Sequence, residues 1–242
     1  MTYNICSGGD FTNYDPQSGK FPMNLTAAAE AIRRYNPDIV GLNEVRGEGP
    51  HPDYPEQAKI LGETLGMYYY FGRSIFFEGN LPYGNALLSR FPILDAEVIG
   101  IPDPVVKDEP EYYETRSILK ARLDCREPLT VLVSHFGLNR GERENAVTTL
   151  CALLRDISGP CVFVGDLNME PDDPLLSPIF SLLSDTAQTS GSPLLTFSSW
   201  EPEMKIDYIF VSKSIKTLEA VSLDEKASDH RPYLAMVETS TS

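Results

Sequence analysis

The stretch Cys161-Val162-Phe163-Val164-Gly165-Asp166-Leu167-Asn168 places two polar side chains directly after a short apolar run. A run of this length, rich in β-branched and aromatic residues, predicts a buried strand over 161–164. Asp166 and Asn168 are two positions apart, so in extended geometry both point to one face while Leu167 points to the other. The same pair could equally form an Asx-turn between a strand and a helix.

Amide and acidic side chains recur beside other predicted strands. Asn4 lies within the predicted strand Thr2–Cys6, and Asn43-Glu44 ends the predicted strand 38–43. Strand ends at one edge of a sheet converge on a cleft, so these side chains and Asp166 could share a site. The donors are oxygen-rich, with no His-x-x-x-His or paired-Cys pattern, which favours Mg²⁺ or Mn²⁺ over zinc. Taken alone, Glu44 could also be an exposed acid in a cap or loop.

The C-terminal part carries a candidate pair of an acid and a histidine. A histidine needs a carboxylate or carbonyl on its second nitrogen to fix its tautomer, so His230 paired with Asp207 or Asp229 is chemically sensible. Only three histidines occur in the chain, which makes each informative. The plainer interpretations are a surface turn for His230 and a hydrogen-bonded core histidine for His135, at the end of the predicted strand 129–135.

Helix and strand signals alternate along the rest of the chain. The stretch 7–22 is polar and Gly-rich and is predicted to be a loop. Further helices are predicted over 27–34, 55–65, 142–157 and 174–183, and further strands over 67–77, 85–89, 118–123, 206–211 and 233–237. This interleaving predicts sheets covered by helices. The order alone does not distinguish a doubly wound sheet from two packed sheets.

Composition sets limits on partners and compartment. The net charge of -15 repels polyanions, so a nucleic-acid substrate is open but not favoured. No apolar run approaches the ~20 residues that cross a bilayer, so no transmembrane segment is predicted. The four cysteines lack CxxC spacing and lie in apolar segments, which predicts buried free thiols. No leader-like segment opens the chain, so a cytoplasmic protein is expected, unless a leader preceding Met1 has been removed.

Seven segments together, in order from Thr2 to Val237, resemble the endonuclease/exonuclease/phosphatase superfamily, which includes deoxyribonucleases, abasic-site endonucleases, sphingomyelinases and inositol-polyphosphate 5-phosphatases. They are 2–5, 39–44, 83–90, 134–136, 165–168, 206–210 and 228–232. The resemblance implies one α/β (α+β) domain over 1–242, expected to be a monomer. Its fold would be a four-layer αββα sandwich, in which two packed mixed β-sheets are flanked by helices.

The resemblance also implies a role for each matching residue. Glu44 would be the principal ligand of Mg²⁺, with Asn4 beside it and Asp229 completing or supporting the metal shell. Asp166 would orient or deprotonate the attacking water, and Asn168 would hold a phosphoryl oxygen.

Further implied roles concern the phosphate. His230 would contact the scissile phosphate with Asp207 as its partner, while His135 lies at the position used for phosphate contact or leaving-group protonation. Arg116 precedes a predicted strand much as a phosphate-binding arginine does in the deoxyribonuclease branch. Asn139 is a further candidate for substrate binding.

The implied activity is metal-dependent hydrolysis of a phosphodiester or phosphomonoester by an activated water. The acidic charge and the absence of a Lys/Arg-rich stretch favour a small or headgroup-type substrate. The alternatives are a Mg²⁺-dependent nuclease acting on DNA or RNA, and a catalytically inactive module that binds through the same cleft. The segments 11–22, 76–83 and 101–114 are expected to shape the substrate pocket.

Overall fold

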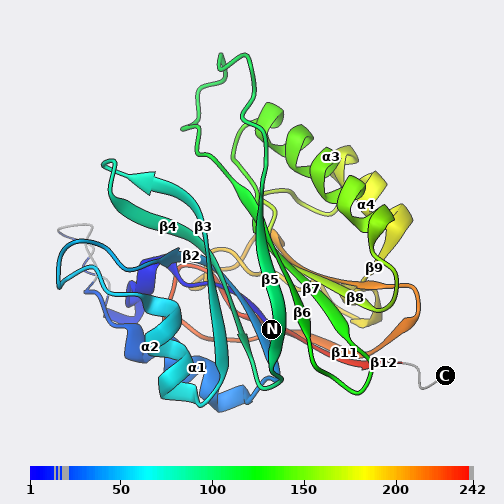
Figure 1. The fold of residues 1–242 in the computed structure, drawn as a ribbon, viewed down its shortest axis with the longest axis horizontal. Coiled ribbons are helices and arrows are strands. Elements are labelled where there is room, and N and C mark those ends of the chain that lie inside the picture. The colour runs from blue at the N-terminus through cyan, green and yellow to red at the C-terminus, as the bar shows by residue number, and fades with distance from the viewer. Residues whose placement is uncertain (14, 16, 18–21, 240–242) are drawn as a thin grey trace.

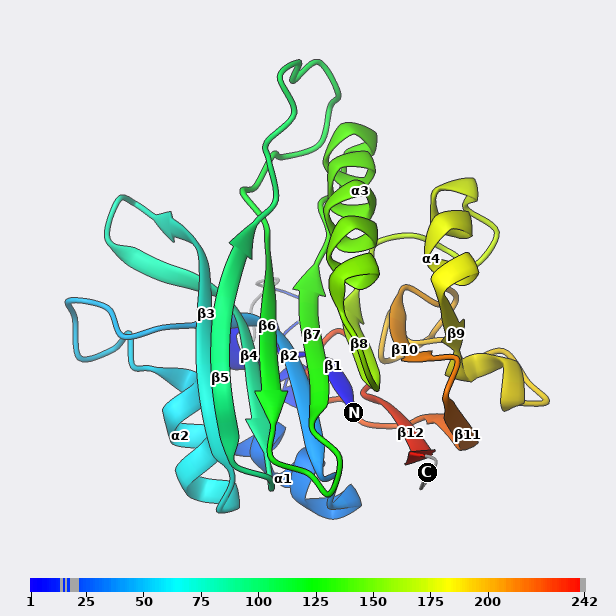
Figure 2. The ribbon, with the colours of Figure 1, turned by 45° about the vertical axis from the view of Figure 1, so that its right-hand side comes forward.

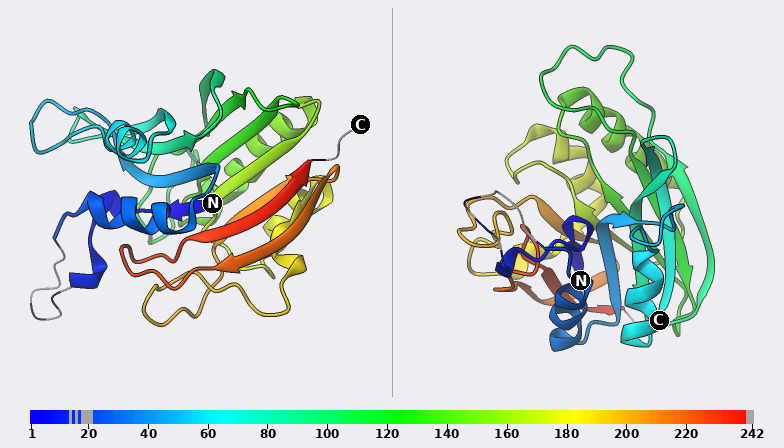
Figure 3. Two further views of the ribbon diagram at one scale, coloured as in Figure 1. Left: turned by 90° about the horizontal axis from the view of Figure 1, so that it is seen from below. Right: turned by 90° about the vertical axis from the view of Figure 1, so that its left-hand side faces the viewer.

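Two six-stranded sheets form the centre of the computed structural model, which describes residues 1–13, 15, 17 and 22–239 (Figure 1). The first sheet has the order β11-β12-β1-β2-β4-β3. Its strands are β1 (Thr2–Asn4), β2 (Ile39–Arg46), β3 (Tyr68–Phe77), β4 (Leu81–Ser89), β11 (Ile215–Ser222) and β12 (Tyr233–Thr239). Strands β1 and β2 are parallel and β1 and β12 antiparallel, so the sheet is mixed. Figure 3 shows β12 passing beside the start of the chain.

The second sheet has the order β5-β6-β7-β8-β10-β9. Its strands are β5 (Ile93–Gly100), β6 (Ser117–Leu123), β7 (Leu129–His135), β8 (Cys161–Asp166), β9 (Leu183–Asp185) and β10 (Asp207–Ser212). Strands β7 and β8 are parallel, while β8 and β10 are antiparallel, so this sheet is also mixed.

Helices cover the outer face of each sheet (Figure 2). Helices α1 (Leu25–Tyr35) and α2 (Gln57–Leu65) pack on the first sheet, and α3 (Arg140–Asp156) and α4 (Ser177–Leu182) pack on the second. Short 3₁₀ turns are η1 (Cys6–Gly8), η2 (Phe11–Asn13), η3 (Pro174–Leu176) and η4 (Thr186–Thr189). The rest of the predicted loop 7–22 includes residues 14, 16 and 18–21, which lie outside the described residues.

Buried apolar side chains fill three separate interfaces, one between each pair of layers. In β7, Val131 and Val133 face the first sheet, whereas Leu132 joins the cluster under α3. Because side chains alternate along a strand, this apolar run is buried on both faces. Each such side chain contributes about 1.5–3 kcal/mol through burial. The three interfaces confirm the predicted four-layer αββα sandwich and exclude the doubly wound alternative.

The sequence signals missed three of the four edge strands of the described sheets, whereas the edge strand β3 was predicted over 67–77. Strand β5 was not predicted, because most of its residues are exposed or half-buried and it offers no apolar run. Strands β9 and β11 were missed as well, and the helix predicted over 174–183 ends at Leu182, where η3 and α4 give way to β9. All four cysteines are free as expected, but Cys6 and Cys125 are only half-buried. Among the described residues, no helix is long and apolar enough to cross a membrane.

Candidate functional site

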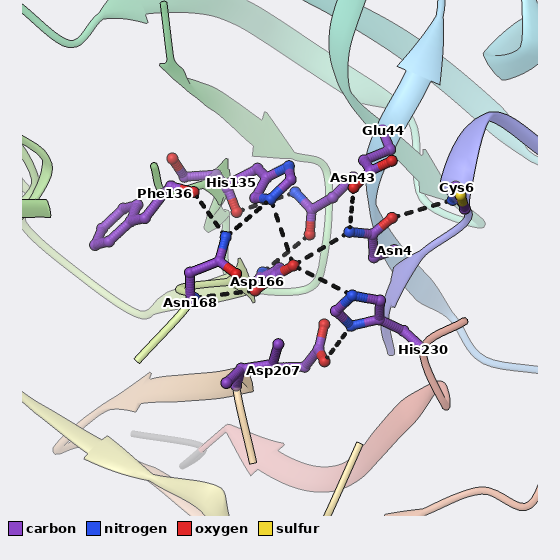
Figure 4. Close-up of polar contacts among 12 residues, drawn as sticks. Asn4, Cys6, Asn43, Glu44, His135, Phe136, Asp166, Asn168, Asp207 and His230 are labelled. Carbon is purple, nitrogen blue, oxygen red and sulfur yellow. Dashed lines mark hydrogen bonds and ion pairs between the residues drawn. The ribbon is translucent and has the colours of Figure 1, made fainter. Parts of the chain in front are cut away.

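The register of the strands brings the polar residues of both sheets to one edge of the sandwich. In the first sheet, Asn4 of β1 lies opposite Asn43 of the parallel strand β2. In the second sheet, Asp166 of β8 lies opposite His135 of β7 on one side and Asp207 of β10 on the other. Figure 4 shows these side chains converging with those of Glu44, Asn168 and His230.

Asp166 occupies the centre of this group and is buried. Its Oδ2 accepts a hydrogen bond from Asn4 Nδ2 at 3.1 Å. The same oxygen lies 3.4 Å from His135 Nε2 and 3.6 Å from His230 Nε2. Burial raises the pKa of Asp166 to about 7, and Asp207 acts in the same direction while His230 opposes it. A carboxylate with this pKa can accept a proton near neutrality, as a general base must.

Asp166 and Asn168 form an Asx-turn and not an extended strand, yet both side chains reach the same site. The backbone N–H of Asn168 donates to Asp166 Oδ1 at 3.0 Å, which is an Asx-turn. Asn168 has a φ of 51°, so the chain leaves the strand in a left-handed conformation. This turn directs the Asn168 amide back to the site, where Nδ2 donates to the carbonyl of Phe136 at 2.9 Å and lies 3.2 Å from His135 Nε2.

Glu44 reaches the site through an irregularity in β2. The pairing of β2 with β4 shifts between Leu42 and Val45, and Glu44 has a φ of 57° at that point. A bulge of this kind re-aims a side chain, at the cost of an unfavourable backbone conformation. The Glu44 carboxylate accepts from Asn4 Nδ2 at 2.9 Å and from the Tyr83 hydroxyl at 3.0 Å. Strand β2 therefore continues past Glu44 and does not end before it.

His230 forms its ion pair with Asp207 and not with Asp229. Its Nδ1 lies 2.8 Å from Asp207 Oδ2, and both side chains are buried. Burial disfavours the imidazolium, but Asp207 and Asp166 outweigh burial and raise the pKa of His230 to about 10. The histidine is therefore positively charged at neutral pH. Asp229 instead accepts from Ser228 Oγ at 3.0 Å.

His135 has a different partner. Its Nδ1 lies 2.9 Å from Nη1 of Arg116, and the same Nη1 forms an ion pair with Glu114 at 2.6 Å. Burial lowers the pKa of His135 well below its ordinary value, and Arg116 and His230 lower it further. The two histidines beside Asp166 thus differ in charge.

Asn139 is not brought together with this group. It is buried at the start of α3, where Nδ2 donates to Glu142 Oε2 at 2.8 Å and to the carbonyl of Glu111 at 3.2 Å. The side-chain nitrogen thus forms hydrogen bonds both to the loop before β6, at Glu111, and to the first turn of α3, at Glu142. A contact with substrate would require these bonds to break.

A buried amide bridge joins the two sheets through Asn43, which the sequence had grouped with the site, and Asn85, which it had not assigned a role. Asn43 Nδ2 donates to Asn85 Oδ1 at 2.8 Å and to the carbonyl of Ser134 at 3.0 Å. The backbone N–H of Asp166 donates to Asn43 Oδ1 at 3.0 Å. Because unpaired buried amides are costly, this network holds β8 at a defined position against β2. An amide side chain beside the apolar run 86–88 was the signal that could have identified Asn85.

Two groups of side chains have the chemistry to hold a metal ion. Ligand atoms of Asp166, Asp207 and His230 lie within 4.8 Å of one another and are buried. However, Asp207 and His230 already satisfy each other in an ion pair. The second group is the carboxylates of Glu44 and Asp229: burial raises the pKa of Asp229, His230 opposes this, and the negative charge of Glu44 raises the pKa further. Carboxylates that repel one another are suited to a hard divalent cation, so this group fits the oxygen donors such an ion prefers.

Comparison with known proteins agrees with this arrangement. The profile of the Endonuclease/Exonuclease/phosphatase family matches residues 1–230. The structure of an endonuclease/exonuclease/phosphatase from Beutenbergia cavernae superposes with a TM-score of 0.78 at 23% identity, covering 98% of this chain and 70% of that chain. A mannosyl-6-phosphatase from Bacteroides thetaiotaomicron superposes with a TM-score of 0.74 at 18% identity, covering 98% of both chains.

One curated relative is longer than this chain. Protein cwh43 of Schizosaccharomyces pombe is 27% identical over an alignment of 173 positions, which covers 64% of this chain but only 17% of that protein. The match to the family profile, by contrast, covers nearly all of this chain and includes the strands that carry Asn4, Glu44 and Asp166. The chain belongs to the endonuclease/exonuclease/phosphatase family.

Proposed function

We propose that this chain is a divalent-metal-dependent phosphoesterase, acting on a small or headgroup-type phosphodiester or phosphomonoester with Mg²⁺, or Mn²⁺ in its place. The observation that carries the proposal is the buried Asp166 carboxylate, which has a pKa of about 7 and lies between two histidines. A base poised near neutrality, beside one charged imidazolium, is suited to activating water next to a phosphoryl group. Members of the family act on phosphoester bonds.

In this proposal each residue of the site has a separate task. Asp166 orients the water and accepts its proton as the oxygen attacks phosphorus in line with the leaving group. The His230 imidazolium, held by Asp207, faces the negative charge that builds on the phosphoryl oxygens. Asn168 donates a hydrogen bond to one of those oxygens.

Glu44, with Asn4 and Asp229 beside it, would hold the metal ion. A bound divalent cation supplies further neutralisation of the phosphoryl charge. Asn4 links the two parts of the site, because its Nδ2 donates to Glu44 at 2.9 Å and to Asp166 at 3.1 Å. The amide thereby fixes the distance between the metal-binding carboxylate and the base.

The choice of a compact substrate rests on charge. The chain carries 35 acidic and 20 basic side chains, which oppose the approach of a polyanion. A small phosphoester meets mainly the local field of His230 and the metal, so it escapes most of that repulsion. A phosphatase of a phosphorylated sugar with the same fold shows that the fold is compatible with such substrates. A module that only binds would not need a charged dyad and a base at neutral pKa in one cleft.

The experiment measures hydrolysis of an aryl phosphodiester and an aryl phosphomonoester with a chelator, and again after Mg²⁺ or Mn²⁺ is restored. Chelation should abolish activity and Mg²⁺ should restore it. Glu44→Gln should lower kcat/KM by about 10²-fold at limiting Mg²⁺, because a metal ligand is lost. Glu48→Gln is the matched control, since Glu48 is exposed and outside the site. Full activity in chelator, or a Glu44→Gln protein that behaves as the wild type, would contradict the proposal.

A further inference from the structure

The two histidines that flank Asp166 have opposite partners at the same ring position. Nδ1 of His230 faces the carboxylate of Asp207 at 2.8 Å, whereas Nδ1 of His135 faces the guanidinium of Arg116 at 2.9 Å. The Nε2 atoms of both rings point to the same oxygen, Oδ2 of Asp166 (Figure 4). The partner at Nδ1 therefore decides what each ring can do at Nε2.

A guanidinium has only N–H donors and no acceptor. A hydrogen bond between Arg116 and His135 consequently requires that Nδ1 be the acceptor, without a proton. The single ring proton of His135 must then be on Nε2, on the side of Asp166 and Asn168. Protonating both nitrogens would place two N–H groups against each other at 2.9 Å.

Arg116 is held where it is by its own partner. Its Nη1 lies 2.6 Å from Glu114 Oε1, and both side chains are only 11% exposed. The backbone N–H of Glu114 donates to Glu142 Oε1 of α3 at 2.9 Å, which attaches this segment to the second sheet's helix layer. Because a buried ion pair is costly to break, the guanidinium cannot readily leave His135.

The Nε2–H group of His135 is not used fully in this arrangement. Its distance of 3.4 Å to Asp166 Oδ2 exceeds the usual 2.7–3.2 Å of an N–H···O bond. The other near atom is Nδ2 of Asn168 at 3.2 Å, and an amide N–H cannot accept a proton. The ring thus presents an available donor to the space between Asp166 and Asn168.

We propose that Arg116, held by Glu114, is a positioning residue that keeps His135 as the neutral Nε2–H tautomer, so that His135 donates a hydrogen bond to a non-bridging phosphoryl oxygen. His135 is then a phosphate-binding group and does not protonate the leaving group, because a neutral imidazole N–H is a very weak acid. Arg116 acts on the substrate through His135. The assignment of the tautomer stands on the free protein, whereas the contact with a phosphoryl oxygen rests on the proposed function.

The tautomer can be read directly from the free protein by nitrogen NMR of ¹⁵N-histidine-labelled chain. Three histidines give three ring systems, and His51, which is exposed, serves as the reference. His135, assigned with a His135→Gln sample, should show a neutral ring with the proton on Nε2 throughout the range from about pH 6 to about pH 8. If the His135 ring of the wild-type protein is charged, or carries its proton on Nδ1, the proposal is wrong, and no variant is needed to show it.

Two variants of Arg116 distinguish the effect of its N–H donor from the effect of its positive charge. Arg116→Gln can still donate to Nδ1 and should keep the Nε2–H signal, whereas Arg116→Met removes the donor and should release the ring into mixed or charged forms. Arg73→Met is the matched control, because Arg73 is exposed and stacks on Phe76 away from the site.

The role in phosphate binding is tested with inorganic phosphate as the probe. Arg116→Met should weaken inhibition by phosphate and raise KM by about 10-fold, with Arg116→Gln closer to the wild type. A KM increase with unchanged His135 signals would mean that Arg116 contacts the substrate itself, which overturns its role as a positioning residue. A wild-type protein without phosphoesterase activity would refute the proposed function, yet its NMR spectra would still decide the tautomer.

Discussion

His135 and His230 are both buried but have different partners, and the carboxylate partner of His230 can be replaced by an amide of the same shape. Asp207 Oδ2 lies 2.8 Å from Nδ1 of His230 and is the main group that raises the histidine pKa to about 10 against burial. Its carboxylate stabilises the imidazolium, so the charge persists through neutral and mildly alkaline pH.

We expect Asp207→Asn to move the alkaline limb of the pH–rate profile to lower pH and to reduce kcat. The direction follows from the pKa: without the carboxylate, burial dominates, the imidazolium loses its proton at lower pH, and activity falls with it. The measurement is kcat/KM from about pH 6 to about pH 10, a window that spans the ordinary and the raised histidine pKa. Asp95→Asn is the matched control, because Asp95 is an exposed aspartate of β5 that pairs with Arg122 and does not belong to the site.

The same pair should behave as a unit. The combined effect of Asp207→Asn and His230→Ala on kcat/KM should be smaller than the product of the two separate effects, since either change already removes the charged dyad. Strict multiplicativity would show that the two side chains act independently.

At the scale of elements, the site depends on how closely two parallel strands approach each other. Gly165 of β8 has a φ of 153°, and a Cβ atom there would lie 1.8 Å from the carbonyl oxygen of Ser134 in β7. The next pair along these strands is His135 with Asp166. A side chain at Gly165 would therefore separate the strands beside the base and one histidine.

Gly165→Ala should destabilise the protein by about 3 kcal/mol through overpacking, which lowers Tm by roughly 6–12 °C for a chain of this size. Activity should fall further than stability explains, because the distance between His135 and Asp166 changes. Thermal unfolding and kcat/KM of Gly165→Ala are compared with those of Gly100→Ala. Gly100 lies in β5 of the same sheet, and a Cβ atom there would meet no atom within 4 Å. Equal Tm values for the two variants would show that β7 and β8 can move apart freely.

At the scale of the whole molecule, the distribution of charge should decide the substrate. Three arginines that are distant in sequence are each neutralised by a carboxylate: Arg90 by Asp38, Arg116 by Glu114 and Arg140 by Glu144. The net charge of -15 already includes these arginines, and their carboxylate partners reduce the local positive charge that the three offer to a polyanion. Since phosphate contacts by Lys and Arg supply most nonspecific DNA affinity, the molecule is poorly suited to track a duplex.

We expect a much higher kcat/KM for small phosphoesters and lipid headgroup phosphoesters than for plasmid DNA. Over the screening length of ~10 Å at 0.1 M salt, the negative field opposes a long polyanion more than a compact substrate. Rates are measured on both substrate classes at several salt concentrations. Efficient plasmid nicking that weakens steeply with salt would instead support the nuclease alternative.

The sequence alone was sufficient for the family and the layered fold, and it named most of the polar residues that the structure brings together. The composition of a short segment predicts buried strands such as 161–164. Apolar spacing and capping residues predict the helices. Both kinds of signal are local in the sequence. The edge strand β5 lacked such a signal, since its exposed residues carry no apolar pattern. Local patterns did not distinguish a doubly wound sheet from two packed sheets. The ordered motifs along the whole chain, which resemble one family, predicted two packed sheets.

Only the tertiary structure decided which of these residues act on one another. From local chemistry alone His230 could pair with Asp207 or Asp229, and the resemblance implied Asp207; the structure shows the pair with Asp207, 23 positions away. Arg116, just before β6, bonds His135 at the end of β7, and Glu44 faces Asn4 because β2 bulges at that point. Partners, charge states and tautomers depend on distances and burial between segments far apart in the chain. The local sequence around a histidine does not contain that information, because the fold alone brings its partner within hydrogen-bonding distance.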